Sequence, residues 1–192
     1  EKDWSQAAFF LCGGAISGDI CLTGMNLCSR QGDKRILNIL NDFHADITVE
    51  QDCIHVKKSR LQAADVDVRD VPDLVPVLAV LACYAQGKTR LYNAARLRLK
   101  ESDRLSAMYT ELQKLGADIS MEEDCLEIRG GKPLHGGEIF SHNDHRIAMA
   151  LAVCSLGTQG DIVIREPYCI EKSYPAFYKD FIEAGGRVHE PY

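Results

Sequence analysis

The 192-residue sequence lacks most of the motifs that identify a cofactor or a metal by themselves. It has no glycine-rich nucleotide loop, no Gly-x-Ser-x-Gly nucleophile elbow and no His-Glu-x-x-His metal motif. Its eight cysteines form no Cys-x-x-Cys pair, and none has a histidine at the usual zinc-ligand spacing. We therefore expect no metal site, no cofactor, and reduced cysteines in a cytoplasmic protein.

The sequence also lacks the signals of a membrane or nucleic-acid protein. No apolar run approaches the roughly 18 residues of a membrane span, and no signal peptide is present. The net charge of −6 argues against general nucleic-acid binding. The chain begins Glu1-Lys2-Asp3 without a methionine and runs at once into an apolar segment, which suggests a piece of a longer protein.

Internal repetition is the strongest structural signal. The segments from Ala45 to Val56 and from Ala117 to Ile128 each read as an alternating strand, an acidic turn and a second alternating strand, which predicts a hairpin. Each follows an amphipathic helix. A third, truncated copy runs from Tyr174 to Gly185, and the chain ends where its hairpin would begin.

Upstream of each copy, a helix that starts at Asp or Asn runs to a glycine and is followed by a short strand. The repeating unit is therefore βαβαββ, which predicts an α/β protein with parallel strand pairs. We expect a single domain with units at about residues 1–64, 65–132 and 133–192, the last one incomplete. Helices are expected around residues 3–16, 33–43, 73–86, 103–115, 144–156 and 175–184.

The stretch from Arg96 to Arg104 concentrates charge where two expected elements meet. Leu97 and Leu99 alternate with basic residues, which predicts the end of a half-buried strand. A helix with one apolar face follows, and Ser102 is placed to cap it.

The cations of this stretch lie at an electrostatically unfavourable position. A helix N-terminus carries about half a positive charge, so Lys100 and Arg104 are costly there unless an anion binds. Glu101 lies among them, where it can neutralise a cation or handle a proton. The alternatives are a surface segment with solvated charges and, for Glu101, an ion pair with Arg98 or Arg104.

Cations recur at other expected helix starts, which suggests a shared site for several anions. Arg146 suits a bidentate grip on a carboxylate or phosphate, with an ion pair to Asp144 as the alternative. His145 can shuttle protons, or it can simply bond the backbone at a helix start. Lys172 precedes a helix that we expect Ser173 to cap, although alone it would be read as a surface lysine.

Asp73 is a candidate base because its place in the repeat is level with the cationic helix starts. Capping of the helix that follows explains the same residue fully, so the two interpretations stay open.

Four blocks of this sequence together resemble the enolpyruvyl transferases that make 5-enolpyruvylshikimate 3-phosphate, the EPSP synthases. The blocks occur in the family's order, and they are Pro72-Asp73, Leu99-Lys100-Glu101-Ser102-Asp103-Arg104, Asn143-Asp144-His145-Arg146-Ile147-Ala148-Met149 and Lys172-Ser173-Tyr174-Pro175. The resemblance covers nearly the whole chain and about the C-terminal 45% of such an enzyme. It implies a domain of three βαβαββ units of the inside-out α/β barrel type, whose helix N-termini face a cleft.

The resemblance also implies a reaction without metal or cofactor, in which shikimate 3-phosphate and phosphoenolpyruvate give the enolpyruvyl ether and phosphate in aromatic amino acid biosynthesis. Asp73 would bind the shikimate hydroxyls and act as base, Glu101 would exchange protons with the methylene carbon, and His145 is a further proton handler. Lys100 would hold the shikimate phosphate. Three residues would grip phosphoenolpyruvate, namely Arg104, Arg146 and Lys172.

Two other functions remain open at this point: an enolpyruvyl transferase acting on a UDP-aminosugar, and a non-catalytic anion-binding domain. The family's N-terminal lysine and phosphate-binding serines lie outside this sequence. We therefore expect the isolated chain to lack turnover and to need the N-terminal domain as its partner.

Overall fold

The computed structural model describes residues 1–189, and its elements follow the expected repeat. The first group is α1 (Trp4–Ser17), β1 (Asp19–Thr23), the 3-10 helix η1 (Gly32–Arg35), α2 (Ile36–Asp42), β2 (Asp46–Val49) and β3 (Cys53–Lys57). The second is β4 (Val66–Asp67), η2 (Pro72–Leu74), α3 (Val75–Tyr84), β5 (Gly87–Tyr92), η3 (Ala95–Leu99), α4 (Arg104–Lys114), β6 (Asp118–Met121) and β7 (Leu126–Gly130). The third is β8 (His135–Phe140), α5 (His145–Cys154), β9 (Gln159–Arg165), η4 (Pro167–Lys172) and α6 (Phe177–Glu183).

Each group has its own sheet. The second sheet has the order β4-β5-β7-β6, in which β4 runs parallel to β5 and the hairpin strands run antiparallel. The first sheet, β1-β3-β2, has the hairpin but no opening parallel strand among residues 1–189. The third has the parallel pair β8-β9 and no hairpin within the same residues. The α/β class and the repeated βαβαββ unit are confirmed.

The two hairpins are equivalent in detail as well as in outline. The turn of the first is closed by a hydrogen bond from Glu50 N–H to the Cys53 carbonyl, and that of the second by one from Glu122 N–H to the Cys125 carbonyl, both 2.9 Å long. Similar sequences therefore fold into similar turns, as the alternating pattern predicts.

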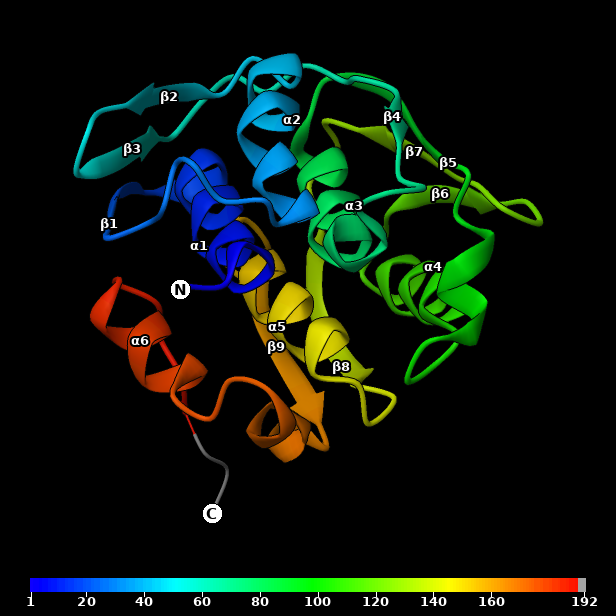
Figure 1. Ribbon diagram of the computed structural model, residues 1–192. Helices are drawn as coiled ribbons and strands as arrows, with labels where there is room; N and C mark the ends of the chain where they lie inside the picture. The colour runs from blue at the N-terminus through cyan, green and yellow to red at the C-terminus, as the bar shows by residue number, and fades with distance from the viewer. Residues whose placement is uncertain (190–192) are drawn as a thin grey trace.

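Three helices form the centre of the domain, and the sheets lie around them (Figure 1). Helices α1, α3 and α5 pack against one another, and all ten residues of α5 are buried. A helix that is apolar on every side has to be surrounded by protein, which explains why sheets enclose these helices. This arrangement brings the loops that precede α3, α4 and α5 together.

The segment that contains Arg96 and Arg98 is a 3-10 helix, so the prediction of a strand end there is wrong. Asn93 takes a left-handed conformation (φ 61°) after β5 and ends the strand. Leu97 then becomes buried while Leu99 is 88% exposed. Alternation of leucine with arginine over so few residues fits a short 3-10 turn as well as a strand.

Two predicted helix caps are also wrong. Helix α4 is capped by Asp103, whose carboxylate accepts hydrogen bonds from Ser106 N–H, and Ser102 instead lies one residue outside. Helix α6 begins at Phe177, while Ser173 ends η4 and donates its N–H to the Ile170 carbonyl. Asp is as good a cap as Ser, so a pattern with both side by side does not choose between them.

The expectation that every cysteine is reduced is wrong for one pair. Cys21 of β1 and Cys53 of β3 form a disulfide between neighbouring antiparallel strands. Their Cα atoms are 6.0 Å apart, a separation that a disulfide can span, and sequence spacing alone does not show that separation.

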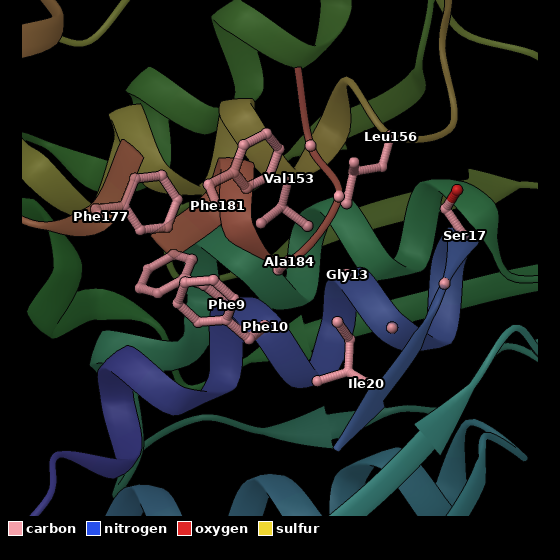
Figure 2. Close-up of a pocket in the computed structure, with 14 residues that line it drawn as sticks. Phe9, Phe10, Gly13, Ser17, Ile20, Val153, Leu156, Phe177, Phe181 and Ala184 are labelled. Atoms are coloured by element: carbon pink, nitrogen blue, oxygen red, sulfur yellow. The ribbon is translucent and has the colours of Figure 1, made fainter. Parts of the chain in front are cut away.

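Over the described part of the chain, no helix is both long enough and apolar enough to span a bilayer. An apolar hollow of about 130 Å³ lies where α1, α5 and α6 meet, and Phe9, Phe10, Phe177 and Phe181 converge on it (Figure 2). No titratable side chain lines this hollow, so the chemistry has to be sought elsewhere.

Candidate active site

Asp73 stands at the centre of the charged residues that the sequence singles out. Its Oδ1 lies 3.0 Å from Lys100 Nζ and 2.8 Å from Arg104 Nη1, and its Oδ2 lies 3.3 Å from Arg146 Nη2. No side-chain hydrogen bond caps η2 or α3, so the interpretation of Asp73 as a simple cap is wrong. Loops from the second and third units therefore bring three cations to one carboxylate.

Arg104 is held from two sides and is almost wholly buried. Its Nε and Nη2 donate to Asp144 at 2.8 and 3.2 Å, while Nη1 donates to Asp73. The Arg104 side chain is 3% exposed and that of Asp144 is not exposed at all. A buried arginine needs acceptors for its fixed fork of donors, and two carboxylates supply them here.

The cations keep both carboxylates ionised. Burial by itself raises the pKa of Asp73, but Arg146, Lys100 and Arg104 outweigh it and the pKa is lowered. Burial likewise raises the pKa of Asp144, and Arg104, the Arg146 N–H and Ser102 lower it below its usual value. Opposite charge within about 4–6 Å favours the ionised form strongly enough to overcome desolvation.

The three cations are not fully neutralised by these two carboxylates, and one of their nitrogens has no acceptor. Arg146 Nη1 is buried and is without a hydrogen-bond partner in the part of the chain that is described. Leaving such a donor unpaired costs about 1–3 kcal/mol or more, so this nitrogen favours an acceptor that is brought in from outside. The guanidinium thus has one nitrogen near Asp73 and one buried nitrogen without an acceptor among residues 1–189.

Glu101 contacts His145 rather than a cation. Its Oε2 lies 3.0 Å from His145 Nδ1, and the Glu101 side chain is 42% exposed whereas that of His145 is 7% exposed. The proposed ion pairs of Glu101 with Arg98 or Arg104 are absent from residues 1–189; Arg98 pairs with Asp103 instead. A half-exposed carboxylate against a buried imidazole is an arrangement in which a proton can be passed between the two.

Lys172, the last residue of η4, contacts the loop that precedes α5. Its Nζ donates to the carbonyl and the side-chain oxygen of Asn143, at 2.7 and 2.9 Å. His142 and Asn143 both have left-handed backbones (φ 53° and 54°), which turn the chain sharply before Asp144 caps α5. Lys172 is therefore tied beside the N-terminus of α5 by a turn that also positions Asp144.

Comparison with known proteins agrees with this geometry. The model of the family described as EPSP synthase (3-phosphoshikimate 1-carboxyvinyltransferase) matches residues 1–181. The chain belongs to the EPSP synthase family. A 3-phosphoshikimate 1-carboxyvinyltransferase from Clostridium acetobutylicum is 47% identical over 190 residues, which cover 99% of this chain and 44% of the relative. One from Brachyspira hyodysenteriae is 48% identical over 98% of this chain.

Solved structures support the fold of the EPSP synthase family for this chain. The EPSP synthase of Acinetobacter baumannii has a TM-score of 0.88 and 35% identity over 96% of this chain and 46% of its own. The enolpyruvyl transferase NikO of Streptomyces tendae has a TM-score of 0.78 at 20% identity, a likeness of fold alone. The chain spans about half the length of the curated relatives it matches.

Some residues of this charged cluster do not stand out in the sequence. Asp144 was considered only as a cap or as a partner of Arg146, yet it binds Arg104, and Ser102 donates to it at 3.0 Å. Asp33 of η1 lies near enough to Asp73 to be repelled by it; burial mainly, and Asp73 in part, raise the pKa of Asp33. Asp144 lies inside one of the motif blocks, so its sequence context was a usable signal, whereas Asp33 has none.

Among residues 1–189, two groups of side chains have the composition of a metal site. One, Glu101, Asp144 and His145, belongs to the charged cluster described above. Four donors already occupy the Asp144 oxygens, which leaves that carboxylate no lone pair suited to a metal. The other group, Cys21, Cys53 and His55, lies on the first sheet, where a disulfide joins its two sulfurs.

Proposed function

We propose that this chain provides half of the active site of an enzyme that transfers the enolpyruvyl group from phosphoenolpyruvate to shikimate 3-phosphate. The observation that carries the proposal is the cluster of Lys100, Arg104 and Arg146 around Asp73, in a chain of the EPSP synthase family. Two multiply charged anions need several fixed cations, and preorganised charge is usually the largest contribution to catalysis.

Asp73 is the proposed base for the attacking hydroxyl of shikimate 3-phosphate. With three cations around it, its lowered pKa makes it a weak base. When the substrate anions draw Lys100 and Arg146 toward themselves, Asp73 loses part of this stabilisation and its pKa rises. Substrate binding would thereby make the base stronger at the moment it is needed.

The phosphoenolpyruvate anion is assigned to Arg104, Arg146 and Lys172, and the shikimate phosphate to Lys100. Arg146 has an unpaired Nη1, which would donate to a carboxylate or phosphate oxygen once a small movement uncovers this buried nitrogen. Arg104 is already engaged on three nitrogens, so its role is mainly a fixed positive charge. Lys172 would exchange Asn143 for the substrate.

Glu101 is the proposed acid for the carbon that receives a proton during addition and loses one during elimination of phosphate. The proton that it gives up can be replaced from His145, whose Nδ1 is 3.0 Å away. This assignment explains why Glu101 is half-exposed: the carboxylate has to reach a substrate atom while His145 stays in the protein.

The remaining groups for the reaction would come from the rest of a full-length enzyme, since the relatives are about twice as long. We propose a two-domain enzyme in which residues 1–192 form one domain of three units, located in the cytoplasm, whose reaction uses neither a metal nor an organic cofactor. The isolated chain is then expected to be inactive.

The test joins the chain to the N-terminal half of its Clostridium acetobutylicum relative and measures phosphate release. Release is expected only when both substrates are present, and only from the joined protein. Release with a UDP-aminosugar in place of shikimate 3-phosphate, or no release with either acceptor from a well-folded joined protein, would refute the proposal.

Glu101→Gln in the joined enzyme tests the residue assignment. General acid–base help is typically worth ~10²–10⁴ in rate, so saturated turnover should fall by about that factor with little change in substrate binding. Glu123→Gln, in the exposed turn between β6 and β7, is the control and should leave turnover unchanged. Near-normal saturated turnover of Glu101→Gln would remove this residue from the catalytic list.

A further inference from the structure

Three metal-ligating side chains gather on the first sheet, away from the charged site. Cys21, Cys53 and His55 each offer a ligand atom, and these atoms all lie within 4.8 Å of one another. We call these three residues the outer cluster. Nothing in the proposed reaction uses them, because Asp73 and its cations belong to loops of the second and third units.

The strand register explains how residues far apart in the sequence come together. Cys21 of β1 lies directly opposite His55 of β3, and Cys53 is two residues along the same strand, so all three point to one face of the sheet. Ile54 and Val56, which alternate with Cys53 and His55 along β3, are buried on the other face of the sheet. The outer cluster therefore lies on the face that is turned away from the core.

Acidic side chains lie beside the outer cluster. A shallow hollow of about 230 Å³ on the same hairpin is lined by His55 together with Asp46, Thr48, Glu50 and Lys57. Its two carboxylates outnumber its one lysine, which favours a cation at this surface. The hollow also gives room for a fourth ligand, either water or a carboxylate oxygen.

We propose that the reduced outer cluster binds one borderline-soft divalent cation of the Zn²⁺ type. Two thiols lose their protons on binding, so two thiolates and a neutral imidazole hold the ion with no net charge, and two protons are released. Sulfur and imidazole nitrogen are the ligands that Zn²⁺ prefers, at about 2.3 and 2.0–2.1 Å. Ligand atoms within 4.8 Å of one another need only small side-chain rotations to reach this geometry.

The disulfide between Cys21 and Cys53 makes the site dependent on redox state. A disulfide sulfur is no thiolate, so the oxidised pair lacks two of the three ligands. A phosphine reductant restores them: with one water it converts the disulfide to two thiols and becomes a phosphine oxide. The sulfurs of Cys21 and Cys53 can therefore either bind a metal ion or form the disulfide, but they cannot do both at once.

The experiment titrates the purified chain with Co²⁺ under anaerobic conditions, before and after reduction with a phosphine. The reduced chain should bind about one Co²⁺ and develop thiolate-to-cobalt charge-transfer and tetrahedral d–d absorption, which Zn²⁺ then abolishes. The oxidised chain should show neither signal. Activity is not measured, so this result is independent of the proposed transferase reaction.

Variants distinguish the outer cluster from the other thiols. Cys53→Ser should weaken Co²⁺ binding more than about 100-fold, since even outer partners of a metal ligand are worth roughly 10–100-fold. His55→Ala keeps both thiols and should lose the tetrahedral d–d bands. Cys28→Ser changes an exposed cysteine outside the cluster and should bind like the unchanged chain.

Two results would overturn the proposal. One is a reduced, folded chain that gives no thiolate-to-cobalt band at excess Co²⁺. The other is a Cys53→Ser or His55→Ala variant that is folded by circular dichroism and binds Co²⁺ as tightly as Cys28→Ser does.

Discussion

Asp144→Asn tests whether the buried charges around Arg104 hold the domain together. The native carboxylate accepts from Arg104 Nε and Nη2, from Ser102 Oγ at 3.0 Å and from the Arg146 N–H at 2.9 Å. Asparagine has nearly the same shape but one oxygen fewer. Its amide N–H₂ would face donors, and Arg104 would keep only the partly exposed Asp73 as its counter-charge.

The expected loss of stability is large for a single atom exchange. Removing one partner of a buried ion pair typically costs about 3–5 kcal/mol, because the other charge stays buried and uncompensated. With a urea slope of about 2–3 kcal/mol per molar, the unfolding midpoint should fall by about 1–2.5 M. A domain is stabilised by only about 5–15 kcal/mol, so the loss is a considerable fraction of the whole.

The assay is urea unfolding followed by the fluorescence of Trp4, the only tryptophan and a fully buried one. Ser102→Ala removes one hydrogen bond to the same carboxylate and should cost about 1 kcal/mol, which keeps a measurable folded state. Asp118→Asn breaks an exposed pair with Lys132 and should cost less than about 1 kcal/mol. An Asp144→Asn midpoint close to that of Asp118→Asn would refute the reasoning.

The stability difference between the unchanged chain and Asp144→Asn should depend on pH, and the pKa of Asp144 fixes the direction of that dependence. The pKa of Asp144 is lower in the folded chain than in the unfolded chain, where it is about 3.9. As the pH falls through 4, the unfolded state takes up the proton first, so the contribution of Asp144 to stability is present above about pH 5 and is lost on acidification. The difference between the unchanged chain and Asp144→Asn should therefore shrink below pH 4.

Two further substitutions test packing elsewhere in the domain by the same urea assay. Glu111→Gln should cost about 1–3 kcal/mol near neutral pH, because the buried Glu111 carboxylate accepts from the Phe140 N–H, Lys114 and His142; a midpoint within error of the unchanged chain would contradict this. Gly130→Ala should cost about 3 kcal/mol or more, since a Cβ there would overlap the carbonyl oxygens of Ala82 and Ala85. Gly137→Ala serves as the control, because a Cβ at that position meets only ordinary contacts. Equal stability of the two variants would contradict the prediction and show that β7 can shift away from α3.

The fold can be predicted from the sequence because the pattern of apolar and polar residues is strong and recurs in several copies of one unit. The hairpins from Ala45 and from Ala117 alternate clearly, and each copy supports the interpretation of the other. The central helices α1 and α5 start after Asp3 and Asp144, whose carboxylates cap them, in line with the expectation that each copy opens with a helix starting at Asp or Asn. Agreement between local preference and repeated context is what makes such elements readable from one sequence.

The failures lie where the signal is short. The segment from Arg96 to Lys100 has two leucines, which are too few to distinguish a strand from a 3-10 turn. The left-handed backbone of Asn93, which ends β5, has no signature in the surrounding sequence. The Cys21–Cys53 disulfide joins residues 32 apart in the sequence, so only the register of β1 on β3 reveals it. The predicted cap of α4 fails for a related reason, because Ser102 and Asp103 stand side by side and both suit the position, whereas α6 follows Ala176 and has no side-chain cap.

In the candidate site three of the predicted cations gather at one carboxylate, but the sequence does not predict which carboxylates hold them. Arg104 bonds Asp73 and Asp144, which are 31 and 40 residues away in the sequence, and no local rule chooses between such distant charges. The structure nevertheless shows why these carboxylates have to be there. Three cations gathered without counter-charge would repel one another and prevent folding. In the proposed polyanion site an internal carboxylate would hold the cations together. Asp73 is the more exposed of the two carboxylates that bind Arg104, so it is the one that an incoming substrate would displace from its cations.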